Sequence, residues 1–276
     1  MRIYISADGE GITGLVNSQE MYPGEPEYAF GRRMMTADVN AAVEGAFRGG
    51  ATDVVVNDAH WTMRNILLDQ LDPRADLIRG FNKPMAMMEQ VQAADGVLFI
   101  GFHARVGDSD SVANETILGK EMIGVRMNGR PVGEGEINAA IAGHFGVPVL
   151  MASGDNLLEQ ELKETLPDLE YAVTKFAIDR WTARCLSPEK SHDAIRQAAE
   201  RAVRNHRAAP YRVSGPVTFE VEFVSTASAG LASLIPGVER IRPRCVSFVG
   251  GDILEAWRGL FSMILLGSTA ADAIYG

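Results

Sequence analysis

The stretch RIYISADGE (residues 2–10) begins with a strand pattern and ends in two carboxylates. Apolar and polar side chains alternate in residues 3–6, and β-branched and aromatic residues in such alternation are typical of a β-strand. Asp8 and Glu10 follow the strand, separated only by Gly9. Two crowded carboxylates repel each other unless a positive charge lies between them, so this D-G-E sequence indicates either a divalent metal site or simply a polar turn.

Further apolar runs predict how the rest of the chain folds. They occur at residues 53–56, 96–102 and 147–152, and segments with helical spacing lie between them. This alternation predicts an α/β fold with a mostly parallel sheet and flanking helices. The main expected helices span residues 34–49, 84–94, 137–144, 156–166 and 188–206.

The composition changes near residues 210–216, which are rich in proline and polar groups. Beyond them, residues 217–224 alternate cleanly between apolar and polar side chains, as an antiparallel or edge strand should. We therefore expect an α/β metal-binding catalytic domain over residues 1–210 and a small α+β unit over residues 211–276 that packs on it.

The composition limits the classes of function. The 276 residues are 46% apolar with a net charge of −10, which disfavours nucleic-acid binding. No run reaches the ~18–20 apolar residues of a membrane span, and no secretory leader is recognisable. Cys185 and Cys245 have no metal-binding spacing, so we expect reduced thiols in a cytoplasmic protein, although a single disulfide between them stays open.

Two of the five histidines end apolar strands. His60 follows the run at 53–56, and His103 follows the run at 96–102. Because the carboxyl ends of parallel strands meet at one edge of a sheet, we expect both to lie near Asp8 and Glu10. Glu134, between two glycines at a predicted helix start, is positioned to join them.

Three carboxylates and two imidazoles suit two divalent ions bridged by one carboxylate. Nitrogen and oxygen ligands without thiolates favour zinc, which would polarise a carbonyl and acidify a bound water. Asp58 is open to two interpretations, as a partner of the site or as a helix cap. The remaining histidines, on predicted helices, are interpreted as surface or packing residues: His144, His192 and His206.

Several ordered motifs resemble those of the bacterial zinc-dependent D-aminopeptidase family, the one associated with dipeptide-transport operons. They are DGE (8–10), NDAH (57–60), GFHAR (101–105), RPVGE (130–134), SGD (153–155), CLSP (185–188), LIPG (234–237) and DILEA (252–256). The resemblance implies two zinc ions held by the same five residues, with Asp8 bridging. It also implies release of N-terminal D-amino acids from short peptides, and a homodecamer that encloses a chamber.

One position departs from that family. Its members carry a further active-site histidine in the loop after the GFHA motif, where this chain has Asn114 when counted back from Gly119. Asparagine can orient a substrate or stabilise an oxyanion, but it cannot act as a general base near neutral pH. Glu115 or Glu136 could take the proton. A different substrate and a weakened or inactive homologue are the other outcomes left open.

We therefore expect a two-zinc, aminopeptidase-like hydrolase that acts on short peptides or related amides and forms a homo-oligomer. The first alternative is a catalytically altered homologue, with a different amide substrate or only a metal-binding role. A two-metal phosphoesterase is the second alternative, disfavoured because Arg105 is the one basic residue expected near the site to hold a phosphate.

Overall fold

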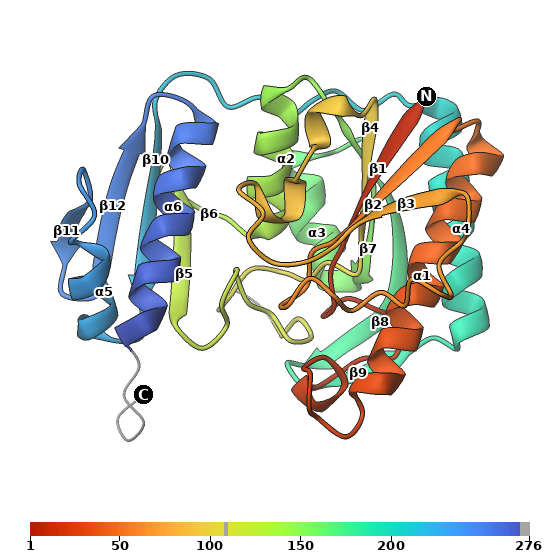
Figure 1. Cartoon of the computed structure of the whole chain (residues 1–276), viewed down its shortest axis with the longest axis horizontal. Helices are drawn as coiled ribbons and strands as arrows, with labels where there is room; N and C mark the ends of the chain where they lie inside the picture. Colours follow the sequence, from red (N-terminus) through yellow and green to blue (C-terminus); the bar gives the residue numbers. More distant parts are fainter. Residues whose placement is uncertain (108–109, 271–276) are drawn as a thin grey trace.

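The computed structural model describes residues 1–107 and 110–270, which form two sheets with helices around and between them (Figure 1). The larger sheet has the strand order β3-β2-β1-β4-β7-β8-β9, and the smaller has the order β11-β12-β10-β5-β6. The strands of the larger sheet are β1 (Arg2–Ala7), β2 (Asp53–Asp58), β3 (Ala75–Ile78), β4 (Gly96–Ile100), β7 (Val149–Asp155), β8 (Glu170–Asp179) and β9 (Thr182–Cys185).

In the larger sheet, β2 and β3 lie on one side of β1, and β4 and β7 lie on the other side, so the strand order reverses at β1. This strand pairs in parallel with β2 on one side and with β4 on the other. The two registers place Ala7 level with both Asp58 and Ile100. Residues that directly follow β1, β2 and β4 therefore meet at one edge, at the kind of switch point where open α/β sheets bind ligands.

The helices cover both faces of the larger sheet. α1 (Tyr28–Gly49) and α4 (Pro188–Asn205) lie together on one face, while α2 (Glu134–His144) and α3 (Asn156–Thr165) lie on the other (Figure 1). The α/β architecture and its mostly parallel sheet are as predicted, and β8–β9 is an antiparallel hairpin at the edge. α1 begins at Tyr28, six residues before the expected start at Met34.

The predicted methionine-rich helix at 84–94 is wrong. The segment forms two short 3₁₀ turns, η2 (Ala86–Met88) and η3 (Val91–Ala93), because Ala86 and Gln90 have left-handed φ angles of 43° and 68°. The Met87 carbonyl accepts hydrogen bonds from the hydroxyls of Tyr4 (3.2 Å) and Ser6 (2.9 Å) instead of a helical N–H. Long-range contacts thus override the local helical pattern.

The smaller sheet is antiparallel throughout its pairings. Its strands are β5 (Met122–Met127), β6 (Arg130–Pro131), β10 (Val217–Phe223), β11 (Glu239–Arg242) and β12 (Cys245–Gly250). The hairpin β5–β6 lies before residue 210 in sequence, yet β5 pairs with β10. The division into domains at 1–210 and 211–276 stays a prediction, and any unit built on this sheet also includes the hairpin. Residues 271–276 lie outside the described residues.

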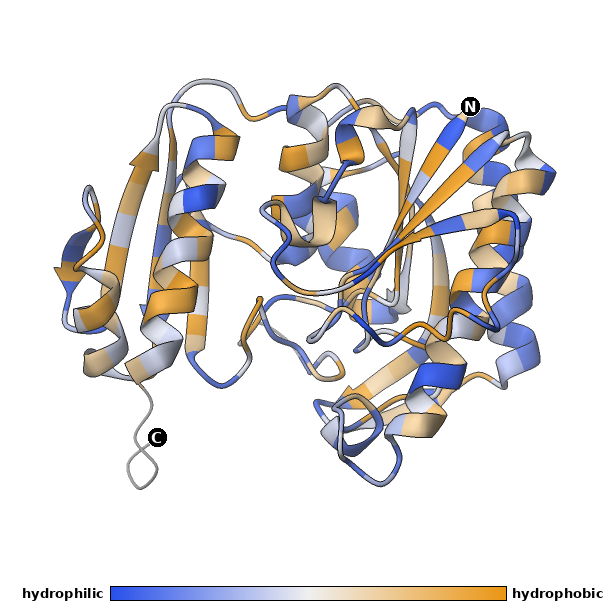
Figure 2. Cartoon of the chain, in the orientation of Figure 1, coloured by the Kyte–Doolittle hydropathy of each residue, from blue (hydrophilic) through white to orange (hydrophobic). Residues whose placement is uncertain are grey.

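Helix α6 (Ile253–Gly267) connects the two halves of the molecule. It packs on β10 and β12 and faces α2, while the short helix α5 (Thr226–Ala232) lies beside it (Figure 1). Most residues in the strands and on the sheet-facing sides of the helices are hydrophobic, and the outer sides of the helices are more polar (Figure 2). One core cluster includes Phe99, Ile137 and Trp257, so it continues from the larger sheet through α2 to α6.

None of the helices in the described residues combines the length and the apolar character that crossing a membrane requires. Cys185 is exposed on β9 and Cys245 is buried on β12, and both are free thiols. A disulfide between them, left open by the sequence, is therefore not formed in this structure.

Candidate metal centre

The predicted site residues converge where β1, β2 and β4 end. The Asp8 N–H donates to the Ile100 carbonyl (2.8 Å), and the Ala59 N–H donates to the Ala7 carbonyl (2.8 Å). These bonds hold the three strand ends level. Asp8, His60 and His103 therefore follow neighbouring strands at the same height, as the parallel pattern predicted.

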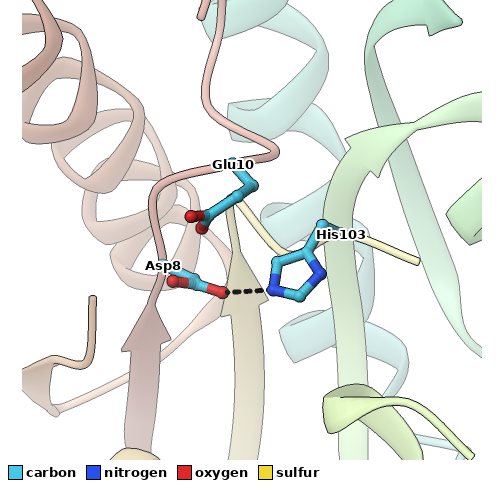
Figure 3. Close-up of side chains that lie close together, drawn as sticks. All are labelled: Asp8, Glu10 and His103. Carbon is cyan, nitrogen blue, oxygen red and sulfur yellow. Dashed lines mark ion pairs between the residues drawn. The ribbon is translucent and has the colours of Figure 1, made fainter. Parts of the chain in front are cut away.

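The two oxygens of Asp8 face different partners. Oδ1 lies 3.2 Å from Nδ1 of His60. Oδ2 lies 3.2 Å from Nε2 of His103 (Figure 3). The same His60 nitrogen lies 3.2 Å from Oε2 of Glu10, and the same His103 nitrogen lies 3.6 Å from Oε1 of Glu134. Asp8 therefore stands between a His60–Glu10 pair and a His103–Glu134 pair.

The centre is buried and acidic. Asp8, Glu10 and Glu134 are at most 5% exposed. Burial alone would lower the pKa of His60 and of His103, but the facing carboxylates raise both well above their usual range. For Asp8, burial opposes ionisation, yet the neighbouring imidazoles of His103 and His60 hold its pKa below the usual range. The centre thus stabilises positive charge strongly.

Two buried oxygens of this centre lack a hydrogen-bond donor. They are Oδ2 of Asp8 and Oε2 of Glu10, each close to an imidazole nitrogen but without hydrogen-bonding geometry. Buried carboxylate oxygens without donors are costly unless a cation is near. Nitrogen and oxygen donors in this number suit zinc, so the residues present fit that ion. Asp8, Glu10 and His103 form one group of possible ligands, and His103, Glu115 and Glu134 form another.

The D-G-E loop is packed tightly from both sides. A Cβ on Gly9 would lie 2.7 Å from the His60 ring, so only glycine allows this approach. On the other side, the buried Lys175 ammonium on β8 donates to the carbonyls of Glu10 (2.6 Å) and Leu15 (2.5 Å). Lys175 was missed by sequence reasoning, although a lysine inside an apolar strand was a usable signal.

Asn114 and Glu115 were predicted to act on the substrate. Glu115 lines a cavity next to the centre. Its loop has left-handed φ angles at Ala113 (48°) and Ile117 (67°), a strained backbone of the kind common at functional sites. Burial, and then the nearby Glu10 carboxylate, raises the pKa of Glu115 to about 8. Asn114 is buried, does not appear among the described residues that line the cavity, and accepts a hydrogen bond at its carbonyl from Arg180 (3.1 Å).

Two other acidic candidates have local structural roles. Glu136 accepts a hydrogen bond from the Gly133 N–H (2.7 Å) and so caps α2. Asp58 accepts from the backbone N–H groups of Asn65 (2.5 Å) and Ile66 (2.7 Å), which folds the loop after His60 back on itself. Asp58 thus caps no helix among the described residues; it supports the loop that carries His60, because the Asn65 amide donates both to the Asp58 carboxylate (2.9 Å) and to the His60 carbonyl (2.6 Å).

The other histidines lie away from the centre. His192 on α4 pairs with the buried Asp38 at 3.2 Å, and the His144 ring packs against Phe145. His206 follows the end of α4 and its ring nitrogen lies 3.2 Å from the Val203 carbonyl. These positions agree with the expected surface and packing roles.

A cavity of about 460 Å³ opens from the centre toward α6, a volume typical of small-ligand sites. Asp8, His60, Glu115 and Glu134 line its acidic part. Its walls include aromatic and aliphatic side chains: Tyr22, Trp61, Met63, Phe81, Met87, Ile137, Trp257, Phe261 and Ile264. Neither Tyr22 nor Arg64, which also lines it, carried a recognisable sequence signal.

Comparisons with known proteins agree with this arrangement. The model of the Peptidase_M55 family, described as D-aminopeptidase, matches residues 1–261. A D-aminopeptidase of Bacillus subtilis (strain 168) is 35% identical over 266 residues, which cover 95% of this chain and 96% of that protein. The solved structure of the Zn-dependent D-aminopeptidase DppA from Bacillus subtilis, described as a self-compartmentalizing protease, superposes with a TM-score of 0.94. It is 35% identical and covers 97% of this chain and 98% of that one.

Proposed function

This chain belongs to the D-aminopeptidase family, and from that premise we propose that it is a zinc aminopeptidase that releases N-terminal D-amino acids from short peptides. The observation that carries the proposal is the buried centre, in which each oxygen of Asp8 faces its own histidine and each of these histidines faces a glutamate. Such a centre next to a cavity of small-ligand size supports hydrolysis of a small amide.

Two zinc ions per chain are proposed. His60 and Glu10 would hold one ion, His103 and Glu134 would hold the other, and Asp8 would bridge them. When bound, the ions would polarise the scissile carbonyl and make water a better nucleophile. The donor set and the two buried carboxylate oxygens without hydrogen-bond donors support this assignment.

Glu115 is proposed as the residue that transfers the proton. It lines the cavity near His103 and Glu134, and its carboxylate can exchange a proton with a group bound there. It would take a proton from the attacking water and give it to the leaving amine. Asn114, next to it, would contribute by orienting the substrate or by fixing the strained backbone that carries Glu115.

The experiment is a screen of the zinc-loaded protein against matched D- and L-aminoacyl dipeptides. We expect release of the N-terminal residue from D-configured substrates, lost in the Asp8→Ala variant. Failure of every peptide with zinc fully bound would favour the alternative, a homologue with a different amide substrate or a metal-binding role alone.

We also propose that the chain assembles into a closed homo-oligomer, a decamer by likeness to its relatives, and works in the cytoplasm. The description of the Bacillus subtilis relative as self-compartmentalizing supports the assembly. The two free cysteines are what a reducing compartment would leave. Light scattering coupled to size-exclusion chromatography would measure the number of subunits, and a monomer would contradict the proposal.

A further inference from the structure

Arg64 is the one arginine or lysine among the described residues that line the cavity. The other charged lining residues are carboxylates or the His60 imidazole. Within residues 1–107 and 110–270, the Arg64 guanidinium forms no ion pair. Among the described lining residues, the Arg64 guanidinium is therefore the cationic group on the cavity wall that could bind a negatively charged part of a ligand.

The loop that bears Arg64 is held firmly. The Asp58 carboxylate binds the backbone N–H of Asn65, the residue after Arg64, at 2.5 Å. The Asn65 amide in turn donates to the His60 carbonyl (2.6 Å), and the Arg64 carbonyl accepts from Arg32 (3.3 Å). Arg64 is thus attached to the same short loop as His60, so the backbone fixes its Cα relative to the metal centre, and its exposed side chain lies at the cavity wall.

The wall between these charged groups is largely apolar. Phe81, Met87, Phe261 and Ile264 all contribute to it. Because an aminopeptidase cleaves the first peptide bond, the N-terminal residue of a bound peptide would lie at the metal centre and its C-terminus farther along the wall. A zwitterion with an amine at one end, a carboxylate at the other and an apolar side chain fits both the charges and the wall.

We propose that Arg64 is a specificity residue that binds the free C-terminal carboxylate of a short peptide with an apolar side chain. This inference rests on the proposed function and names the substrate class of that same site. The α-amino group would lie toward the carboxylates of the centre, and the guanidinium would pair with the far end of the peptide. Peptides that lack the terminal carboxylate would then be poorer substrates.

The test compares D-alanyl-phenylalanine with its C-terminal amide. For the zinc-loaded protein, kcat/KM should be roughly tenfold to a hundredfold higher for the free acid, the size expected for a charge-assisted hydrogen bond. Arg64→Gln should remove this preference by lowering kcat/KM for the free acid, because only the free acid has a carboxylate for the guanidinium to bind. Arg79→Gln, which removes the same charge from an exposed residue outside the cavity, should retain the preference.

Equal kcat/KM for acid and amide in the unmodified protein, or an unchanged preference in Arg64→Gln, would overturn the inference while leaving the peptidase proposal intact. If neither compound is cleaved, the peptidase proposal fails, and calorimetry still tests Arg64. Tighter binding of the acid that disappears in Arg64→Gln would support the role of Arg64, and equal affinity for the two ligands would overturn it.

Discussion

At the scale of single residues, the loop after His103 carries both residues that are proposed to act on the substrate, Asn114 and Glu115. Glu115 lines the cavity and stands close to His103 and Glu134, whereas Asn114 does not appear among the described lining residues. Counting along the sequence identified Asn114 as the exchanged position. The left-handed backbone at Ala113 and Ile117 presents the next residue instead.

Glu115→Gln is therefore predicted to lower kcat by about 10²–10⁴-fold, because the amide cannot exchange the proton. Zinc content should be unchanged, since Glu115 is not among the five proposed ligands. Asn114→Ala should lower kcat much less. The check is steady-state kinetics together with metal analysis of both variants, and the assignment is wrong if Asn114→Ala is the more damaging change.

Lys175→Met is predicted to weaken zinc binding roughly tenfold to a hundredfold, because residues that support metal ligands have effects of that order. The lysine holds the carbonyls of Glu10 and Leu15, which would be left buried without their donor. A competition titration with a zinc chelator measures the effect. Lys163→Met, on the exposed surface of α3, serves as the control. Unchanged zinc affinity in Lys175→Met would show that the lysine only stabilises the fold.

The sequence was informative about residues that follow strands and uninformative about residues in irregular loops. His60 and His103 were predictable because parallel strands bring their carboxyl ends together whatever lies between them. Glu115, Tyr22 and Arg64 depend on loop backbones that are set by long-range contacts, such as the hydrogen bond from Arg32 to the Arg64 carbonyl. No local pattern encodes those contacts.

At the scale of elements, α3 supports the centre through Glu161. Its carboxylate accepts a hydrogen bond from the Arg105 N–H (3.0 Å), two residues after His103. Burial raises the pKa of Glu161 to about 7, above its ordinary value of 4.5. The unfolded chain therefore ionises first as the pH rises, so this group makes the folded state progressively less stable between about pH 4.5 and 7.

Glu161→Gln should remove that pH dependence. The free energy of unfolding of the variant minus that of the unmodified protein should rise by roughly 3 kcal/mol as the pH increases from 4.5 to 7.5. Urea unfolding at both pH values, with a chelator present to remove the pH dependence of zinc binding, measures this. A difference that does not change with pH would mean that Glu161 ionises in the folded state as it does in solution.

Helix α6 is predicted to shape the substrate pocket from the other half of the molecule. Phe261 stacks on Trp257, with ring centroids 5.1 Å apart, and both line the cavity. Phe261→Ala should lower kcat/KM about tenfold or more for peptides with a bulky apolar side chain, because that contact area is lost. Alanyl-glycine, too small to reach this wall, is the control substrate. Equal losses for both substrates would mean that the change disturbs the centre itself.

The elements themselves were only partly predictable. The strands of the larger sheet and helix α4 follow local patterns, including Ser187 and Pro188 at the helix start. The pairing of β5 with β10 joins residues about a hundred positions apart, which periodicity cannot indicate. The helix predicted for the methionine-rich segment was wrong because of contacts between residues far apart in sequence. The Met87 carbonyl accepts hydrogen bonds from side chains of β1.

At the scale of the whole molecule, two sheets of different type enclose one site. Four of the five proposed ligands follow strands of the larger sheet, and the fifth, Glu134, begins α2. The smaller sheet carries α6, which forms a wall of the cavity. The core is continuous between them through α2. The proposed chemistry therefore depends on the packing of the two halves, although the five proposed ligands come from residues 8–134 alone.

Zinc stoichiometry tests the central claim most directly. About two zinc ions per chain are expected in the unmodified protein by elemental analysis, because each oxygen of Asp8 faces its own histidine and each of these histidines faces a glutamate. His60→Ala and His103→Ala should each retain about one ion, and Asp8→Ala should retain less than one. A single ion in the unmodified protein, or two ions retained by Asp8→Ala, would contradict the account.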